Sequence, residues 1–318
     1  MLIQILLLIF GLIILVKGAD WLVEGASALA KKFGISNLAI GLTIVAFGTS
    51  APELVVNSFA SFNGSFDIVF GNVIGSNNFN LFLILGIAGI ITPLSVQSST
   101  VWKEIPLSFL AIIILFILAN DFFTANSNIL SRIDGIFLAI MFGLFLLYVY
   151  KQLKTEDLVT SEVQKNYSNL KIWVLIIVGL SILVLGGKIV VNNAILLATT
   201  LGVSDKIIGL TIIAAGTSLP ELATSVVAAI KKNNDIAVGN IIGSNIFNIF
   251  LILSVSSFIR PIEFNTIFNT DLYILAGGTI FLFIAMFTGK RKRLDRWEAA
   301  LLLATFIGYT SFLIINEV

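Results

Sequence analysis

The stretch GTSAPELVV at residues 48–56 lies inside an apolar segment long enough to cross a membrane, and GTSLPELAT repeats the pattern at residues 216–224. Each copy places a glutamate, Glu53 or Glu221, directly after a proline. An ionisable side chain in the apolar interior of a membrane is costly, so we expect both glutamates to serve a function. A proline has no N–H for the carbonyl four residues earlier, which predicts a break in the helix at each copy.

The composition is that of an integral membrane protein. Of the 318 residues, 58% are hydrophobic and 12% are charged, and the mean hydropathy is +1.04. A soluble protein of this length cannot bury so much apolar surface. The chain has neither cysteine nor histidine, which excludes disulfides, thiolate metal sites and histidine proton transfer. We expect the lipid bilayer as its surroundings, no nucleic acid and no obligate protein partner.

Apolar segments recur along the whole chain, and their length of about 20 residues matches helices that cross a hydrocarbon core of about 30 Å. We predict an all-α polytopic membrane protein with a single transporter domain over residues 1–318. The charged run at 151–169 is expected to link a first five-helix repeat, 1–150, to a second, 170–318. The ten predicted transmembrane helices are about 2–30, 36–62, 67–91, 104–120, 131–150, 170–199, 204–230, 235–259, 269–288 and 297–315.

An internal repeat relates the two halves. Residues 34–80 align with residues 202–248 at a fixed offset of 168 without a gap, and 25 of the 47 positions are identical. The matches fall on Gly, Thr, Ser, Pro, Glu and Asn, so shared apolar composition does not explain them. Since five is an odd number of crossings, the second half enters the membrane from the opposite side. Two inverted repeats are typical of alternating-access transporters, with the binding site at the midplane between them.

The basic residues predict the orientation. Fourteen lysines and arginines fall on the side of the 151–169 linker, and only Arg132, Lys206 and Arg260 fall on the other. The positive-inside rule makes the linker side cytoplasmic. We therefore expect a protein of the cell (inner) membrane with both termini outside.

The broken helices supply oxygen ligands of several kinds. Thr49 shares a helix face with Glu53, and Thr217 shares one with Glu221. The breaks are expected to free backbone carbonyls near Ala46 and Ala214, which in a membrane must line a cavity or meet a ligand. Carboxylate, hydroxyl and carbonyl oxygens together suit Ca²⁺ or Na⁺. Ser50 and Ser218 add two further hydroxyls.

The helix after each break carries a polar stripe. Asn72, Ser76 and Asn80 stand four residues apart, and Asn240, Ser244 and Asn248 repeat them. We favour ligation for Ser76, Asn80, Ser244 and Asn248. For Asn72, Asn77, Asn240 and Asn245, ligation and hydrogen bonding between helices both stay open. Two carboxylates balance one Ca²⁺, and competition between Ca²⁺ and monovalent ions for one cage would couple opposed fluxes.

These motifs, GTSAPE with GNVIGSNNFN and GTSLPE with GNIIGSNIFN, resemble the calcium/cation antiporter superfamily and its prokaryotic sodium/calcium exchanger branch. The resemblance implies that the first helices of the two halves slide against the other eight helices. It implies no cofactor, with Ca²⁺ and Na⁺ as transported ions. The implied ligands are Glu53 and Glu221 for Ca²⁺ with help from Thr49 and Thr217; Ser50, Ser218, Ser76, Ser244 and the carbonyls of Ala46 and Ala214 for Na⁺; and Asn80 and Asn248 at the centre.

Two details refine the expected coupling. Some relatives carry Asp where this chain has Asn80 or Asn248, so K⁺ transport is less expected here. Relatives coupled to protons tend to have GNATE-like segments, so GTSxPE favours Na⁺/Ca²⁺ antiport. An H⁺/Ca²⁺ antiporter stays as the alternative. An intramembrane acid/base enzyme built on two carboxylates is a remote one, because no further catalytic group breaks the symmetry of the repeat.

Overall fold

The computed structural model describes residues 1–121, 128–153, 167–201 and 214–317. Seven helical segments in this part are long and apolar enough to cross a membrane: Leu2–Phe33, Phe66–Ile91, Thr100–Ala119, Arg132–Gln152, Asn169–Thr200, Asn234–Ile259 and Thr266–Ala285. The bent pair Asn37–Thr49 and Ala51–Asn63 makes an eighth if it is taken as one span. The predicted helical membrane protein is thus confirmed.

The elements follow the two halves of the chain. The first half contains α1 (Leu2–Phe33), α2 (Asn37–Ile40), η1 (Gly41–Val45), α3 (Ala46–Thr49), α4 (Ala51–Asn63), α5 (Phe66–Asn78), η2 (Phe79–Ile84), α6 (Leu85–Ile91), β1 (Leu94–Ser95), η3 (Thr100–Glu104), α7 (Ile105–Ala119), β2 (Ile129–Leu130) and α8 (Arg132–Gln152). The second half contains α9 (Asn169–Thr200), α11 (Ala214–Gly216), α12 (Leu219–Ile230), α13 (Asn234–Phe247), η5 (Asn248–Ile252), α14 (Leu253–Ile259), β3 (Ile262–Glu263), η6 (Thr266–Phe268), α15 (Asn269–Ala285), β4 (Arg293–Leu294) and α16 (Arg296–Glu317). Most of the predicted linker and the beginning of the predicted span at 204–230 lie outside the described residues.

The two proline motifs break their helices as predicted. The helix axis bends by 47° between α3 and α4, where Ser50 leaves the helical conformation with φ −84° and ψ 5°. Ser218 takes nearly the same angles, φ −89° and ψ 5°, just before α12. In both halves the proline lies in the first turn of the new helix, where its missing N–H costs no hydrogen bond.

The central helices are those that carry the repeated polar motifs. In the most apolar window of Asn234–Ile259, 94% of the residues are buried, and in that of Phe66–Ile91, 72% are buried. The corresponding share is 22% for α1 and for α8, whose apolar side chains face outward. Polar side chains on α5 and α13 are therefore enclosed by the rest of the bundle.

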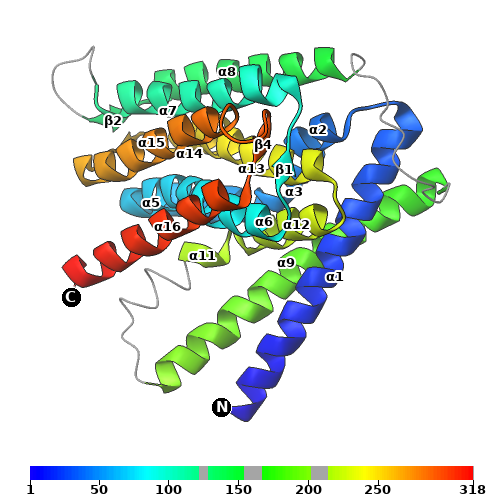
Figure 1. Cartoon of the computed structure of the whole chain (residues 1–318). Helices are drawn as coiled ribbons and strands as arrows, with labels where there is room; N and C mark the ends of the chain where they lie inside the picture. Colours follow the sequence, from blue (N-terminus) through cyan, green and yellow to red (C-terminus); the bar gives the residue numbers. More distant parts are fainter. Residues whose placement is uncertain (122–127, 154–166, 202–213, 318) are drawn as a thin grey trace.

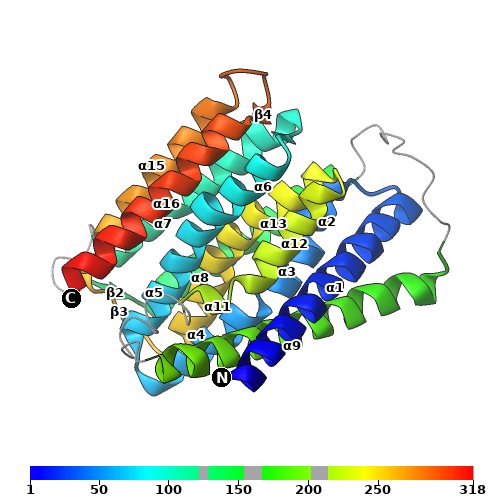
Figure 2. The same cartoon turned by 60° about the horizontal axis from the view of Figure 1, so that its bottom comes forward.

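The two longest helices, α1 and α9, cross at the edge of the bundle (Figures 1 and 2). Glycines allow their backbones to approach closely. A Cβ added at Gly18 would lie 2.7 Å from the backbone N of Leu183, and one at Gly186 would lie 2.8 Å from the backbone N of Leu15. These two contacts correspond to each other at the offset of 168, so the crossing is itself symmetric.

Two short antiparallel strand pairs join the halves. In the first, β1 pairs with β4, with Leu94 opposite Leu294. In the second, β2 pairs with β3, with Leu130 opposite Ile262. Figure 2 shows β4 near one end of the bundle and β2 with β3 near the other. Each half thus contributes one strand to each end.

Candidate functional site

The two motif glutamates lie at the centre of the bundle, one in the first turn of each new helix. Glu53 belongs to α4 and Glu221 to α12, and each is 1% exposed. The N-terminal end of a helix carries a partial positive charge that favours a carboxylate. The two carboxylates are close enough to repel one another, so their site favours a positively charged occupant.

Hydroxyl groups reach these carboxylates from the opposite half. Ser50 donates to Glu221 Oε1 at 2.9 Å, and Ser218 donates to Glu53 Oε1 at 3.3 Å. The Thr49 hydroxyl likewise lies next to Glu221. The sequence analysis grouped the hydroxyls with the carboxylate of their own helix, whereas the structure pairs them crosswise. The serine at the break in each half therefore contacts the glutamate on the helix that follows the break in the other half.

Ser76 and Ser244, on the helices α5 and α13 that follow α4 and α12, lie next to these groups. The hydroxyls of Ser218 and Ser76 lie 3.0 Å apart, and Ser244 donates to Glu221 Oε1 at 3.4 Å. Ser76 on α5 and Ser244 on α13 are 2% and 0% exposed. The structure thus brings both predicted serine pairs to the carboxylates.

The side chains of Asn80 and Asn248 are each held by an asparagine of the opposite half. Asn80 donates its Nδ2 to Asn245 Oδ1 at 3.0 Å, and Asn248 donates its Nδ2 to Asn77 Oδ1 at 2.9 Å. In the described part of the chain, each Oδ1 is buried and has no hydrogen-bond partner. Both residues lie at the beginning of a π-helical turn, η2 or η5, and such turns are frequent at functional sites.

Several buried oxygens on these helices have no hydrogen-bond partner among the described residues, and four of them belong to predicted ligands: Glu53 Oε2, Glu221 Oε2, Asn80 Oδ1 and Asn248 Oδ1. They form a set with one carboxylate and one amide oxygen from each half, which we call the cage. Buried polar atoms are rarely left unsatisfied without a reason. A hard cation satisfies oxygens of this kind, and two negative charges match one Ca²⁺.

A second layer of side chains ties the cage helices together. Thr49 donates to Asn240 Oδ1 at 3.0 Å, and Asn72 donates to Thr217 Oγ1 at 3.1 Å. Asn77 and Asn245 donate to each other's backbone carbonyls. For Asn72, Asn77, Asn240 and Asn245 the sequence left both ligation and hydrogen bonding between helices open, and in the structure all four form hydrogen bonds between helices.

The sequence analysis missed Asn57 and Ser225 in this layer. Asn57 donates to Asn72 Oδ1 at 2.7 Å, and Asn240 donates to Ser225 Oγ at 2.9 Å. Asn57 and Ser225 are equivalent positions of the repeat but differ in residue type. A search for polar residues at equivalent positions, rather than for identical ones, could have found them.

The expectation of a bare carbonyl at Ala46 is wrong in this structure. The Ala46 carbonyl accepts the backbone N–H of Ser50 at 2.9 Å, and the Thr49 hydroxyl, which donates to Asn240 Oδ1, lies 3.3 Å from it. The proline removes the hydrogen bond to the carbonyl of Gly48, so the bond from Ser50 back to Ala46 still forms. Ala214 begins α11, at the position equivalent to Ala46.

Comparison with known proteins extends over both halves. The family model described as "Sodium/calcium exchanger protein" matches residues 3–151 and 171–315. Sodium/calcium exchanger MaX1 of Methanosarcina acetivorans is 31% identical over 96% of this chain and 97% of its own length. Inner membrane protein YrbG of Escherichia coli is 36% identical over 98% of this chain and 97% of its own length.

The fold also matches a solved structure. The sodium-calcium exchanger NCX_Mj, studied without Na⁺ and Ca²⁺, has a TM-score of 0.83 and 32% sequence identity to this chain. The match covers 98% of this chain and 99% of that chain. The arrangement of helices around the cage is therefore that of a membrane exchanger.

Proposed function

The chain belongs to the sodium/calcium exchanger family, and we propose that it exchanges Ca²⁺ for Na⁺ at the cage between Glu53 and Glu221. As a member of this family it is a Na⁺/Ca²⁺ antiporter and not an enzyme. Family membership favours Na⁺ over protons as the driving ion. The observation that carries the site is the set of four buried oxygens without partners, two from each half.

Charge balance in the cage provides the coupling. The carboxylates of Glu53 and Glu221 neutralise one Ca²⁺, with Thr49 and Thr217 at its sides. Na⁺ ions occupy the flanking oxygens of Ser50, Ser218, Ser76 and Ser244, with the carbonyl of Ala214 and the second lone pair of the Ala46 carbonyl, whose first accepts the N–H of Ser50. The two kinds of ion compete for the same carboxylates. The empty cage holds two bare negative charges in the membrane interior, so its return without a cation is strongly disfavoured.

The fold that we propose consists of ten transmembrane helices in two inverted five-helix repeats, 1–150 and 170–318, joined by the linker at 151–169. Two observations support the inversion. The strand pairs lie at opposite ends of the bundle, and β1 and β3 are equivalent positions of the repeat. The α1–α9 crossing has matching contacts at Gly18 and Gly186.

Alternating access follows from a displacement of α1 and α9 along the central helices. Two features support this. Glycines at the crossing let the backbones of α1 and α9 approach closely, so the two helices can move as one unit. The outer surface of α1 is apolar, with exposed Leu6, Phe10 and Ile13, and it loses no hydrogen bonds when it moves through lipid.

We propose the cell (inner) membrane as the location, with the linker inside and both termini outside. The two chain ends lie on the same side of the bundle, away from β4 (Figure 2). Arg293, within the basic run at 290–296, belongs to β4. The basic residues are thus separated from the termini, as the positive-inside rule requires.

The purified protein in liposomes tests this function. We expect an imposed Na⁺ gradient at constant pH to drive Ca²⁺ uptake, and replacement of Na⁺ by choline to abolish it. Because two carboxylates balance one Ca²⁺, exchange of more than two Na⁺ moves net charge, and a membrane potential then alters the rate. Uptake driven only by a pH gradient, at full rate in choline, would contradict sodium coupling.

A further inference from the structure

Four glutamates are buried in the described part of the chain. Glu53 and Glu221 belong to the cage. Glu298 is satisfied, because it accepts hydrogen bonds from the hydroxyl of Thr288 and the backbone N–H of Asp295. Glu104 is 0% exposed and lies outside the cage, yet its Oε2 has no hydrogen-bond partner. It is the buried carboxylate that the exchange mechanism leaves unexplained.

Uncharged polar side chains surround the Glu104 carboxyl. Tyr148 on α8 donates its hydroxyl to Glu104 Oε1. Thr100 and Gln152 also lie next to this carboxyl, and they are only 1% and 8% exposed. Thr100 Oγ1, Gln152 Oε1 and Gln152 Nε2 lie within reach of the carboxyl but make no hydrogen bond of normal geometry among the described residues. We call these four residues the Glu104 cluster, and they gather three oxygens without partners around one negative charge.

The cluster lies at the end of two helices. Thr100–Glu104 is the π-helical turn η3, and Gln152 is the last residue of α8. Lys103 and Lys151, next in sequence to Glu104 and Gln152, are both exposed. The cluster therefore lies beside two exposed lysines, at the end of the molecule where the linker begins.

The second half offers a natural comparison. Tyr309 on α16 donates its hydroxyl to Asp271 in the first turn of α15, as Tyr148 does to Glu104. Asp271 is half-buried, and neither of its carboxylate oxygens is among the buried atoms without a partner in the described residues. Both halves thus contain an acid–tyrosine pair, and only in the first does the carboxylate itself keep an oxygen without a partner among the described residues.

We infer that the Glu104 cluster binds a monovalent cation, and that Na⁺ is its ligand. The carboxylate of Glu104 supplies the charge, and the oxygens of Thr100, Tyr148 and Gln152 complete a hard-oxygen set. This site is separate from the transport cage and lies on the linker side, where its occupancy can respond to Na⁺ on that side alone.

The charge of the cluster selects a monovalent ion. One carboxylate balances Na⁺, whereas Ca²⁺ would leave one positive charge uncompensated in a buried place. The ammonium of Lys103 lies 5.7 Å from the centre of the Tyr148 ring, which adds repulsion against a divalent ion. Neutral amide and hydroxyl oxygens satisfy Na⁺ without further charge.

The test uses a full-length protein whose cage is disabled, the Glu53→Gln/Glu221→Gln double variant. Its thermal unfolding is measured in NaCl and in choline chloride at equal ionic strength. A ligand that binds only the folded protein raises the unfolding temperature with its concentration. We expect such a rise with Na⁺ alone. Addition of Glu104→Gln should remove it, and addition of Asp271→Asn, the matched change in the other half, should leave it intact.

A second variant protects the test against misfolding. Gln152→Leu keeps the carboxyl and removes one neutral oxygen, so it should shift the Na⁺ dependence to about tenfold higher concentration, which corresponds to roughly 1.4 kcal/mol. The absence of any Na⁺-specific rise in the cage-disabled protein overturns the inference. A rise that survives Glu104→Gln overturns it too. Neither result depends on transport, so failure here is distinct from failure of the proposed exchange.

Discussion

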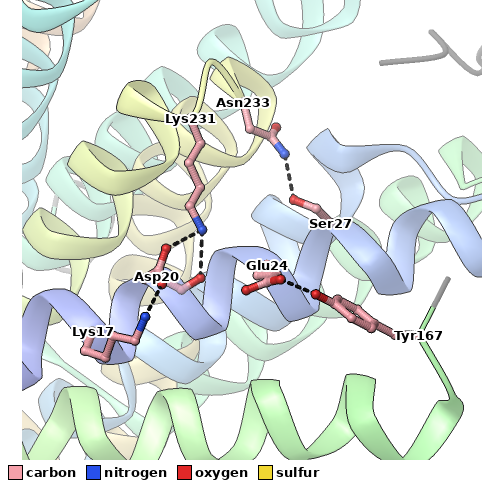
Figure 3. A network of polar contacts seen from close by, with 7 residues as sticks. All are labelled: Lys17, Asp20, Glu24, Ser27, Tyr167, Lys231 and Asn233. Carbon is pink, nitrogen blue, oxygen red and sulfur yellow. Dashed lines mark hydrogen bonds and ion pairs between the residues drawn. The ribbon is translucent and has the colours of Figure 1, made fainter. Parts of the chain in front are cut away.

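The first long helix, α1, is tied to the second half by charged side chains, whereas α9 has no such tie to the first half among the described residues. Asp20 forms an ion pair with Lys231 at 2.5 Å, and Ser27 accepts from Asn233 at 2.9 Å (Figure 3). At the offset of 168, Asp20 corresponds to Lys188, and Lys231 corresponds to Asn63. Lys188 is exposed.

This difference separates two requirements on the same duplicated fold. The cage must meet the same ions from both sides, and its oxygens match between the halves. In the proposed mechanism, the contacts of α1 and α9 determine which side is closed, and these contacts need not match. An ion pair that is about one-third exposed on each partner is worth at most about 1 kcal/mol. It therefore biases the equilibrium between the two states without locking it.

The largest effect is expected where the halves are alike. Glu53→Gln and Glu221→Gln should each abolish Ca²⁺ transport, and to the same extent. At an effective dielectric near 20, a charge pair a few ångströms apart is worth several kcal/mol, which lowers affinity more than about a hundredfold. Ca²⁺ uptake into liposomes measures this, with Asp271→Asn as the control outside the cage. Near-normal uptake by one variant alone would show that the cage is not symmetric.

A smaller and again symmetric effect is expected at the helix crossing. Gly18→Ala and Gly186→Ala both push a methyl group against backbone atoms, so each should destabilise the protein by about 1–3 kcal/mol. Thermal unfolding of the purified variants measures the loss. Gly143→Ala on α8 is the control, because an added Cβ there has nothing within 4 Å. Equal stability of all three variants would mean that the helices do not cross as described.

The smallest effect is expected where the halves differ. Asp20→Asn removes the ion pair with Lys231, so α1 should leave the central helices up to about fivefold more often. Ala30→Cys in this cysteine-free chain, buried on α1, reports the movement through its labelling rate from the linker side. High salt should shrink the difference by screening the pair. An equal increase in Lys188→Gln, the equivalent change on α9, would remove the distinction between the two helices.

Much of this fold could be predicted from the sequence, because apolar length and proline chemistry are local signals. The predicted spans at 67–91 and 235–259 agree with α5–α6 and α13–α14 within a residue, and both helix breaks lie within the predicted proline motifs, at Ser50 and Ser218. The cage residues were found because the duplication repeats them at a fixed offset. Identical polar residues at equivalent positions of two apolar repeats indicate a functional site more strongly than any single motif does.

What could not be predicted depends on partners far apart in the chain. Helical periodicity places Thr49 and Glu53 on one face, but it does not reveal that the Ser50 and Thr49 hydroxyls meet Glu221 instead. Asp20 pairs with Lys17, three residues away on its own helix, and with Lys231, and no local pattern indicates the second of these partners. Ion pairs and π-helical turns depend on how helices pack, and the sequence records them only indirectly.

The strand pair β1–β4 has a consequence for how the chain is made. A ribosome completes residues 94–95 long before residues 293–294, the strand with which they pair. Throughout that interval the backbone N–H and C=O groups of β1 have no partner from β4, and one end of the bundle stays open. The first half thus enters the membrane as an unfinished structure. The hydrogen bonds between β1 and β4 form only after residues 293–294 have left the ribosome, so assembly of the exchanger ends near the C-terminus.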